Sequence, residues 1–378
     1  ITDNVPRLDY TDSSCPALLL EPLRTNLLNF SEYANSGSSS LATITDNTTT
    51  SPEGKQNAAR YLPTAQFGRW ESDIVGVVPT AGTTYTVSMY FNTNSTLDLV
   101  TFYIGWNAAT GSDRSGILFN PGTREFISNF TEGAGTVTDK IIGEPDSNGW
   151  YRVSIIAIAT ANTNSDCVLV LRDLSNKADG VKFVDFYGWQ MEAGSYATSY
   201  IPTYGSSVSR VGETCTDAGT SATFNSTEGV LYAEIAALDN TQSASQYITI
   251  SDGTYNNRLS ILYSNGATNS IRAFLRVGGS SQVDFTSSLT NQKDFNKIAF
   301  KYKENDFALW VNGVEVLTDT SGSVSSANTL NDLSFSEIGT SASPFYGKTK
   351  EVLVFPTALS DADLEILTGT YYESYSAM

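Results

Sequence analysis

The stretch Phe307–Leu317 (FALWVNGVEVL) decides the fold of the second half of the chain. Apolar residues lie on both sides of Asn312-Gly313, and after the turn they alternate around Glu315, which is the period of a half-buried β-strand. A two-residue type I′ turn needs positive φ at both central positions, which asparagine followed by glycine adopts readily. The sequence therefore predicts an antiparallel hairpin that turns at Asn312-Gly313.

Strand patterns continue from this hairpin in both directions along the chain. In Thr84–Asn92 (TYTVSMYFN), for example, Tyr85, Val87 and Met89 share one face. Turns rich in Gly, Asn, Asp and Pro separate the strands, as is typical of antiparallel sheets. We therefore predict an all-β fold with two antiparallel β-sandwich domains. The other predicted strands are Leu97–Trp106, Trp150–Thr160, Cys167–Asp173, Val181–Glu192, Gly229–Leu238, Gln246–Ser251, Asn257–Tyr263, Ile271–Val277, Asn296–Lys303 and Tyr346–Phe355.

One helix is predicted, over Asp361–Leu367 near the C-terminus. Ser360 stands at the N-cap position, and Asp363 stands where an acidic side chain completes a capping box. Gly369 follows the apolar positions and is expected to end the helix.

A passage rich in Gly, Ser and Thr, from Thr203 to Thr223, divides the 378 residues into two parts of ordinary domain size. The first residues carry three prolines around a short apolar run, so we expect an extended arm that packs on a neighbouring subunit or on the next domain. The predicted divisions are an N-terminal arm at 1–25, a first sandwich at 26–203, a linker at 204–221, a second sandwich at 222–370 and a tail at 371–378.

Several kinds of chemistry are excluded by composition. The chain has no histidine, so it has neither a Ser-His-Asp triad nor a histidine-bound metal. A formal net charge of −18 argues against binding to nucleic acid. No apolar run reaches membrane-spanning length, so we expect no membrane insertion.

The three cysteines, Cys15, Cys167 and Cys215, lie far apart and lack the CxxC spacing of a metal knuckle. We expect three buried, reduced thiols, although one disulfide with one remaining thiol also fits the sequence.

Several phrases in the first half resemble a known module. Residues 188–203 read GWQMEAGSYATSYIPT, and residues 148–153 read NGWYRV. Residues 6–10 (PRLDY) and 18–27 (LLLEPLRTNL) add to the resemblance. Together they resemble a jelly-roll module, similar to carbohydrate-binding modules, that recurs in virion proteins of tailed bacteriophages, especially tail or appendage fibres. The resemblance implies an extracellular place on the virion surface, other virion proteins as partners, and a homotrimer.

The second half resembles a concanavalin A-like, laminin-G-type lectin domain over about residues 222–370. Trp310-Val311-Asn312-Gly313 and residues 347–363 (GKTKEVLVFPTALSDAD) carry this resemblance. It implies a sandwich fold more firmly than a function, because this fold hosts many functions.

A sugar-binding sandwich needs aromatic rings for the apolar face of the sugar and polar side chains for its hydroxyl groups. Aromatic residues within strand phrases, Trp150, Trp189 and Trp310, are expected in the core. The candidate glycan-binding residues, which have polar neighbours in the sequence, are Trp70, Tyr103, Trp106 and Asn107 in the first domain and Tyr346 in the second; Tyr255, beside Asn256 and Asn257, is a further candidate.

Catalysis is not expected. Glycan hydrolysis needs two suitably spaced carboxyl groups, and the E-x-D-x-x-E pattern of glycanases with a concanavalin A-like fold is missing; Glu234–Asp239 (EIAALD) has a different spacing. Calcium is a possible cofactor in such modules. Its candidate ligands are Asp9, Asp12, Asp185, Glu192, Asp239, Asp252 and Asp319.

The sequence leads to one preferred function and two alternatives. We expect a virion structural protein, a tail or appendage fibre segment, that recognises cell-surface polysaccharide without catalysis. A secreted bacterial carbohydrate-binding adhesin and a glycan depolymerase are the alternatives.

Overall fold

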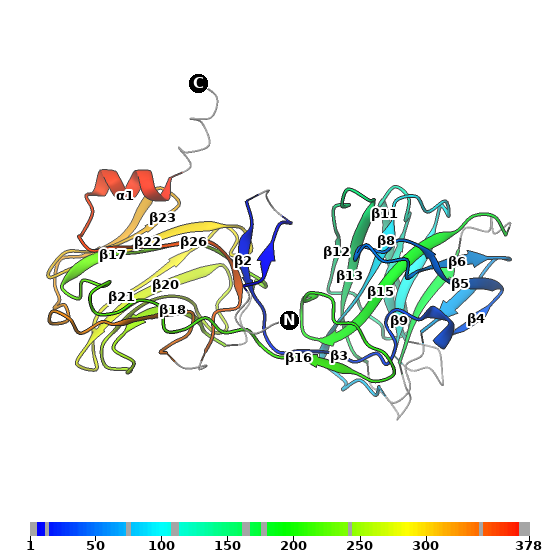
Figure 1. Cartoon of the computed structure of the whole chain (residues 1–378), viewed down its shortest axis with the longest axis horizontal. Coiled ribbons are helices and arrows are strands. Elements are labelled where there is room, and N and C mark those ends of the chain that lie inside the picture. Colours follow the sequence, from blue (N-terminus) through cyan, green and yellow to red (C-terminus); the bar gives the residue numbers. More distant parts are fainter. Residues whose placement is uncertain are drawn as a thin grey trace, which may run out of the picture. The chain divides into compact units, whose positions relative to one another are not determined.

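The computed structural model describes residues 6–11, 15–72, 77–106, 113–160, 167–174, 180–240, 244–339 and 343–369. The chain forms two compact units, one made of Leu23–Val211 and the other of Ile1–Pro22 with Gly212–Met378. Each unit is a sandwich of antiparallel sheets (Figure 1). The predicted all-β fold class is confirmed.

The unit Leu23–Val211 stacks two six-stranded sheets around one apolar core. The first sheet has the strand order β11-β10-β9-β14-β7-β4, and the second has the order β12-β13-β8-β15-β6-β5. The first sheet contains β4 (Ser38–Ser40), β7 (Arg69–Glu71), β9 (Val100–Gly105), β10 (Arg114–Phe119), β11 (Phe126–Glu132) and β14 (Val168–Asp173). The second contains β5 (Ala42–Thr49), β6 (Ala58–Pro63), β8 (Thr84–Asn92), β12 (Asp139–Ile142), β13 (Trp150–Ile158) and β15 (Val184–Ala193). A 3-10 turn η1 (Ala34–Ser36) and a pair of short strands, β3 (Arg24–Asn26) and β16 (Val208–Arg210), complete the unit.

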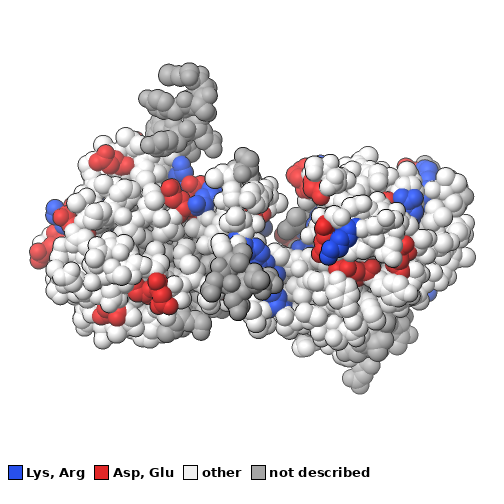
Figure 2. Space-filling view, viewed as in Figure 1, with Lys and Arg blue, Asp and Glu red and all other residues white. Residues whose placement is uncertain are grey.

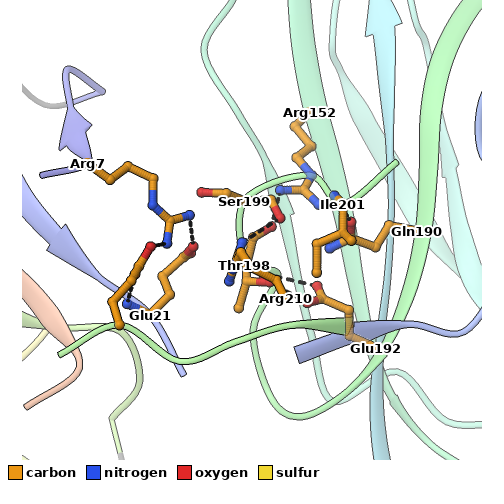
Figure 3. Close-up of polar contacts among 10 residues, drawn as sticks. Arg7, Glu21, Arg152, Gln190, Glu192, Thr198, Ser199, Ile201 and Arg210 are labelled. Atoms are coloured by element: carbon orange, nitrogen blue, oxygen red, sulfur yellow. Dashed lines mark hydrogen bonds and ion pairs between the residues drawn. The ribbon is translucent and has the colours of Figure 1, made fainter. Parts of the chain in front are cut away.

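A segment after β15, residues 194–203, covers the outer face of the second sheet (Figure 3). Arg152 donates to the carbonyl oxygen of Thr198 at 2.5 Å. Glu192 accepts from the backbone nitrogen of Thr198 at 3.0 Å, and Gln190 accepts from that of Ile201 at 2.7 Å. Arg152, Gln190 and Glu192, which hold this covering segment in place, belong to the sequence phrases that resemble the jelly-roll module.

The other unit stacks a seven-stranded sheet on a five-stranded sheet, with a second apolar core between them (Figure 1). The seven-stranded sheet has the order β1-β2-β26-β17-β22-β23-β24, and the five-stranded sheet has the order β21-β20-β19-β18-β25. The first contains β1 (Leu8–Asp9), β2 (Ala17–Leu20), β17 (Glu228–Ala237), β22 (Asn296–Lys303), β23 (Phe307–Val311), β24 (Val314–Asp319) and β26 (Gly347–Phe355). The second contains β18 (Gln246–Ser251), β19 (Arg258–Tyr263), β20 (Ser270–Val277), β21 (Ser280–Ser288) and β25 (Asp332–Ser334).

Both local predictions for this unit are confirmed. Val311 pairs with Val314 across the predicted hairpin, and Asn312 and Gly313 have φ of 50° and 86°. The helix α1 spans Asp361–Thr368, and its N-cap Ser360 accepts from the backbone nitrogen of Asp363 at 3.2 Å.

The N-terminal residues predicted as an extended arm form strands of the C-terminal unit. β2 pairs antiparallel with β26, and Leu20 enters the apolar core. Arg7 bonds Glu21 at 2.5 Å and also pairs with Glu213 (Figure 3). Residues 6–11 and 15–22 thus belong to this unit. Their strand β2 pairs with a strand from the far end of the chain, and this partner cannot be identified from the residues of the arm alone.

The predicted linker 204–221 is also divided between the units. Its β16 residues pair with β3, whereas Ala218 forms a bridge with Leu333. Backbone hydrogen bonds, rather than apolar side chains, give this polar passage its structure. The predicted tail 371–378 lies outside the described residues.

The three cysteines all lie in the described part of the chain and are thiols. Cys167 is buried and Cys215 is half-buried, and burial raises the pKa of the Cys215 thiol. Cys15 is exposed, so the expectation of three buried thiols is wrong for this residue.

The structure predicts that β2 stabilises the C-terminal unit. We expect Leu20→Ala to lower the free energy of unfolding of that unit by about 2–3 kcal/mol, because it removes a buried side chain from the core. Calorimetry of the full chain measures this change. Leu23, which is 59% exposed, supplies the control: Leu23→Ala should leave the unfolding curve unchanged. Equal curves for Leu20→Ala and the parent would contradict a structural role for β2.

Candidate functional site

In the C-terminal unit, the helix α1 covers one of the two outer sheet faces. Leu364 of α1 packs with Tyr232 and Trp310 on the outer side of the seven-stranded sheet (Figure 1). Trp310 is therefore part of a buried cluster, as the sequence analysis expected. The outer face of the five-stranded sheet remains as the other surface of this unit.

Alternation along the strands determines which side chains reach that face. Ile248, Leu259 and Ala273 point into the core, so their neighbours in each strand point outward. The outward residues are Tyr247 and Thr249 on β18, Arg258, Ser260 and Leu262 on β19, and Arg272, Phe274 and Arg276 on β20.

Phe274 lies at the centre of this face, is only 3% exposed and is surrounded by guanidinium groups. The guanidinium carbons of Arg258, Arg272 and Arg276 lie 5.1, 5.3 and 5.8 Å from the centre of its ring. Tyr247 meets the same ring edge-on at 6.4 Å. We call the surface formed by Tyr247, Tyr255, Arg258, Arg272, Phe274 and Arg276 the Phe274 face.

The three arginines differ in their partners. Arg272 forms two contacts with Asp284, at 2.7 and 2.5 Å, and this hydrogen-bonded pair raises the pKa of Arg272. Arg276 has neither a hydrogen-bond acceptor nor a carboxylate partner among the described residues. The face thus presents a guanidinium group that is available to a ligand.

Arg258 is only 4% exposed, and its neighbours hold it in a fixed position. It bonds Glu337 at 2.8 Å, and it lies between the rings of Tyr255 and Phe274. Its Nε is buried and has no acceptor among the described atoms. A buried donor without an acceptor is costly, so this atom marks a place where a ligand oxygen would be favourable.

Tyr255 stands at the rim of the Phe274 face, and its ring is 47% exposed. The loop that carries it is braced by Asn257, which donates to Asp252 at 2.7 Å and accepts from the backbone nitrogen of Gly278 at 2.8 Å. A sugar ring offers an apolar face and hydroxyl groups. The exposed ring of Tyr255 suits the apolar face, and the neighbouring guanidinium groups can donate to the hydroxyl oxygens.

The prediction of glycan binding is wrong for Trp70 and Trp106, because both side chains are fully buried. Trp70 packs against Phe186 and Trp189, and its indole nitrogen donates to the carbonyl oxygen of Ala34 at 2.8 Å. The indole nitrogen of Trp106 donates to Ser115, also at 2.8 Å. Arg69 and Glu71, the neighbours of Trp70 in β7, face the other way, as alternation along a strand requires. Because both indole rings are buried, neither can stack on a sugar.

The two remaining candidates that the structure describes, Tyr103 and Tyr346, belong to different units. Tyr103 points out of the first sheet of its unit, on the side opposite the core that holds Trp70 and Trp106. Tyr346 packs against the core of the C-terminal unit. Asn107 lies outside the described residues. The sequence analysis missed Phe274 and its arginines, although their two-residue spacing in IRAFLRV places them on one face of a strand.

Two of the acidic residues proposed as calcium ligands pair with basic side chains. Asp9 pairs with Lys348 at 2.8 Å, and Asp185 bonds Arg60 at 2.7 and 2.8 Å. Asp12 lies outside the described residues, and within them no group of three Asp, Glu or Cys side chains is placed to hold a metal. In Figure 2, acidic side chains form separate small groups between wide uncharged areas. No helix in the described ranges is long and apolar enough to cross a membrane.

The family model of the concanavalin A-like lectin/glucanases superfamily matches residues 218–365. Residues 218–365, a sandwich of antiparallel sheets, therefore have a lectin-like fold of the concanavalin A-like, laminin-G type, and the Phe274 face lies within them. No curated protein matches the sequence.

Several solved structures are similar in fold. The CBM40 of the Ruminococcus gnavus IT-sialidase is 18% identical, covers 42% of this chain and 97% of its own, and has a TM-score of 0.33. Domain 4 of AbnA, a GH43 extracellular arabinanase from Geobacillus stearothermophilus, in complex with arabinotriose, is 14% identical, with 46% and 80% covered and a TM-score of 0.32. Domains LG4-5 of the mouse laminin alpha1 chain are 8% identical, with 95% and 96% covered and a TM-score of 0.27.

Proposed function

We propose that this chain binds cell-surface polysaccharide, without catalysis, through the Phe274 face of its lectin-like domain. The observation that carries the proposal is the combination of an exposed ring, Tyr255, with guanidinium groups that lack full sets of partners, those of Arg258 and Arg276. The ring offers a surface for the apolar face of a sugar. The guanidinium groups offer donors for its oxygens.

The affinity of one such face is expected to be modest, because one exposed ring and a few hydrogen bonds bury little of a glycan. Several copies of the chain would multiply weak binding through effective concentration. Useful binding is therefore expected from an assembly, and we propose a homotrimer.

We further propose that the assembly is a tail or appendage fibre of a tailed bacteriophage, with other virion proteins as partners and an extracellular position on the virion surface. The support is the resemblance carried by residues 148–153 and 188–203. Mass spectrometry of purified particles tests this proposal. Peptides of the chain in the particles would support it, whereas their presence only in the secreted proteins of a bacterium would favour an adhesin.

The Phe274 face yields a direct mutational test. We expect Tyr255→Ala and Arg276→Gln each to weaken binding by about tenfold on a glycan array probed with the multimerised full chain, since each removes one main contact. Both side chains lie at the surface, so the melting temperature should not change.

Two variants in the same unit serve as matched controls. Tyr10→Ala removes another exposed tyrosine, and Lys293→Gln removes another exposed positive charge. Both should bind like the parent. Full binding by folded Tyr255→Ala and Arg276→Gln proteins would sink the assignment, and release of reducing sugar from a bound glycan would overturn the absence of catalysis.

A further inference from the structure

In the unit Leu23–Val211, the covering segment of residues 194–203 leaves one outer sheet face unoccupied. Residues 194–203 lie on the second sheet, so the outer face of the first sheet is the remaining one. Because Phe102 and Leu171 point into the core, Tyr103 on β9 and Arg172 on β14 point outward. Arg69 and Glu71, which flank the buried Trp70 on β7, point outward as well.

Phe67 stands beside this face in a strained conformation. Its φ of 65° lies in the left-handed region, where a bulky side chain is unfavourable, yet its ring is 45% exposed. The backbone holds it there: Phe67 donates to the carbonyl oxygen of Asp173 at 3.2 Å, and Asp173 donates to that of Gly68 at 2.9 Å. Strain that the surroundings impose on an exposed ring is typical of ligand-binding positions.

Arg172 lies over this ring, with its guanidinium carbon 4.8 Å from the ring centre. Among the described residues no acceptor or carboxylate contacts its guanidinium group, and its Nε is buried without a partner. Arg172 is also directly opposite Arg69 on the neighbouring strand, an arrangement that is unfavourable for like charges.

Glu71 balances only one of these two charges. It accepts from Nε of Arg69 at 3.1 Å and from Ser38 at 3.3 Å. Tyr103 on this face is only 4% exposed, and burial raises its pKa, so its hydroxyl stays protonated. Arg114 lies over its ring but pairs with Glu132, so it adds no net charge to the surface. The surface therefore carries one unbalanced positive charge in a chain whose net charge is −18.

We propose that Phe67, Arg69, Tyr103 and Arg172 form a second subsite, which takes a carboxylate-bearing sugar such as a uronic or sialic acid residue. The carboxylate accepts two hydrogen bonds from Arg172, whose planar guanidinium group suits this geometry. The apolar face of the sugar lies on the Phe67 ring, and the Tyr103 hydroxyl bonds a ring substituent. This subsite goes beyond the Phe274 face, because it lies in a different domain and assigns a class of sugar.

A glycan array of matched pairs tests the subsite. Each pair holds an acidic glycan and its neutral counterpart, for instance an oligogalacturonate with its methyl ester or a sialylated glycan with the same glycan lacking sialic acid. We expect the multimerised full chain to bind the acidic member of at least one pair about tenfold more tightly, and added salt to reduce that preference. Lack of preference in every pair, or a preference only for sulfated or phosphorylated glycans, would overturn the proposal.

Arg172→Gln should remove the acid preference without lowering the melting temperature, because the Arg172 guanidinium group has no hydrogen-bond acceptor to lose among the described residues. Lys140→Gln is the matched control: it removes one charge from the same unit, and Lys140 also lies over a phenyl ring, that of Phe126, at 4.0 Å. It should keep the preference. An acid preference that survives in Arg172→Gln would place the acidic subsite elsewhere.

Phe67→Gly separates binding from folding. Glycine adopts positive φ without strain, so this variant should melt at the same temperature as the parent or higher, while acidic glycans bind about tenfold more weakly. Unchanged binding would remove Phe67 from the subsite. Tyr255→Ala distinguishes this result from failure of the Phe274 face, since it changes the other domain and should leave the acid preference intact.

Discussion

Each sheet in this protein has two faces, and the sandwich fold uses the inner one for the core. Alternation along the strands sends Trp70 and Trp189 inward, where they join an apolar core that is buried on folding. A second constraint follows on the outer side. In each unit one outer face is covered, by α1 in the C-terminal unit and by residues 194–203 in the other. Binding surfaces must therefore be sought on the two remaining faces.

These two faces have the same arrangement of side chains. Each has a central ring, Phe274 or Tyr103, that lies close to arginine side chains. Long arginine stems cover the sheet while the charged ends stay at the surface. In each case a carboxylate pairs with some of the guanidinium groups and leaves one, Arg276 or Arg172, without an acidic partner in the described part of the chain. These two guanidinium groups are therefore available to an external ligand.

Local features could be predicted from the sequence, and features that depend on distant partners could not. The Asn312-Gly313 turn and the Ser360 cap are encoded within a few residues, and both were confirmed. The strand β2 was missed because its partner β26 lies at the other end of the sequence. Trp70 and Trp106 were misassigned because polar neighbours do not tell which face of a strand is buried. The Phe274 face was within reach of the sequence, since the two-residue spacing of Arg272, Phe274 and Arg276 is visible there.

We expect glycans to contact the outer sheet faces that α1 and residues 194–203 do not cover, and not to contact the buried tryptophans. Nuclear magnetic resonance of the side-chain N–H groups tests it most directly, because arginine Nε–H and indole N–H signals are resolved from each other. On addition of a glycan that the chain binds, we expect the signals of Arg172 or Arg276 to shift, while those of Trp70 and Trp106 stay in place. Shifts of the two indole signals with all arginine signals unchanged would contradict this account.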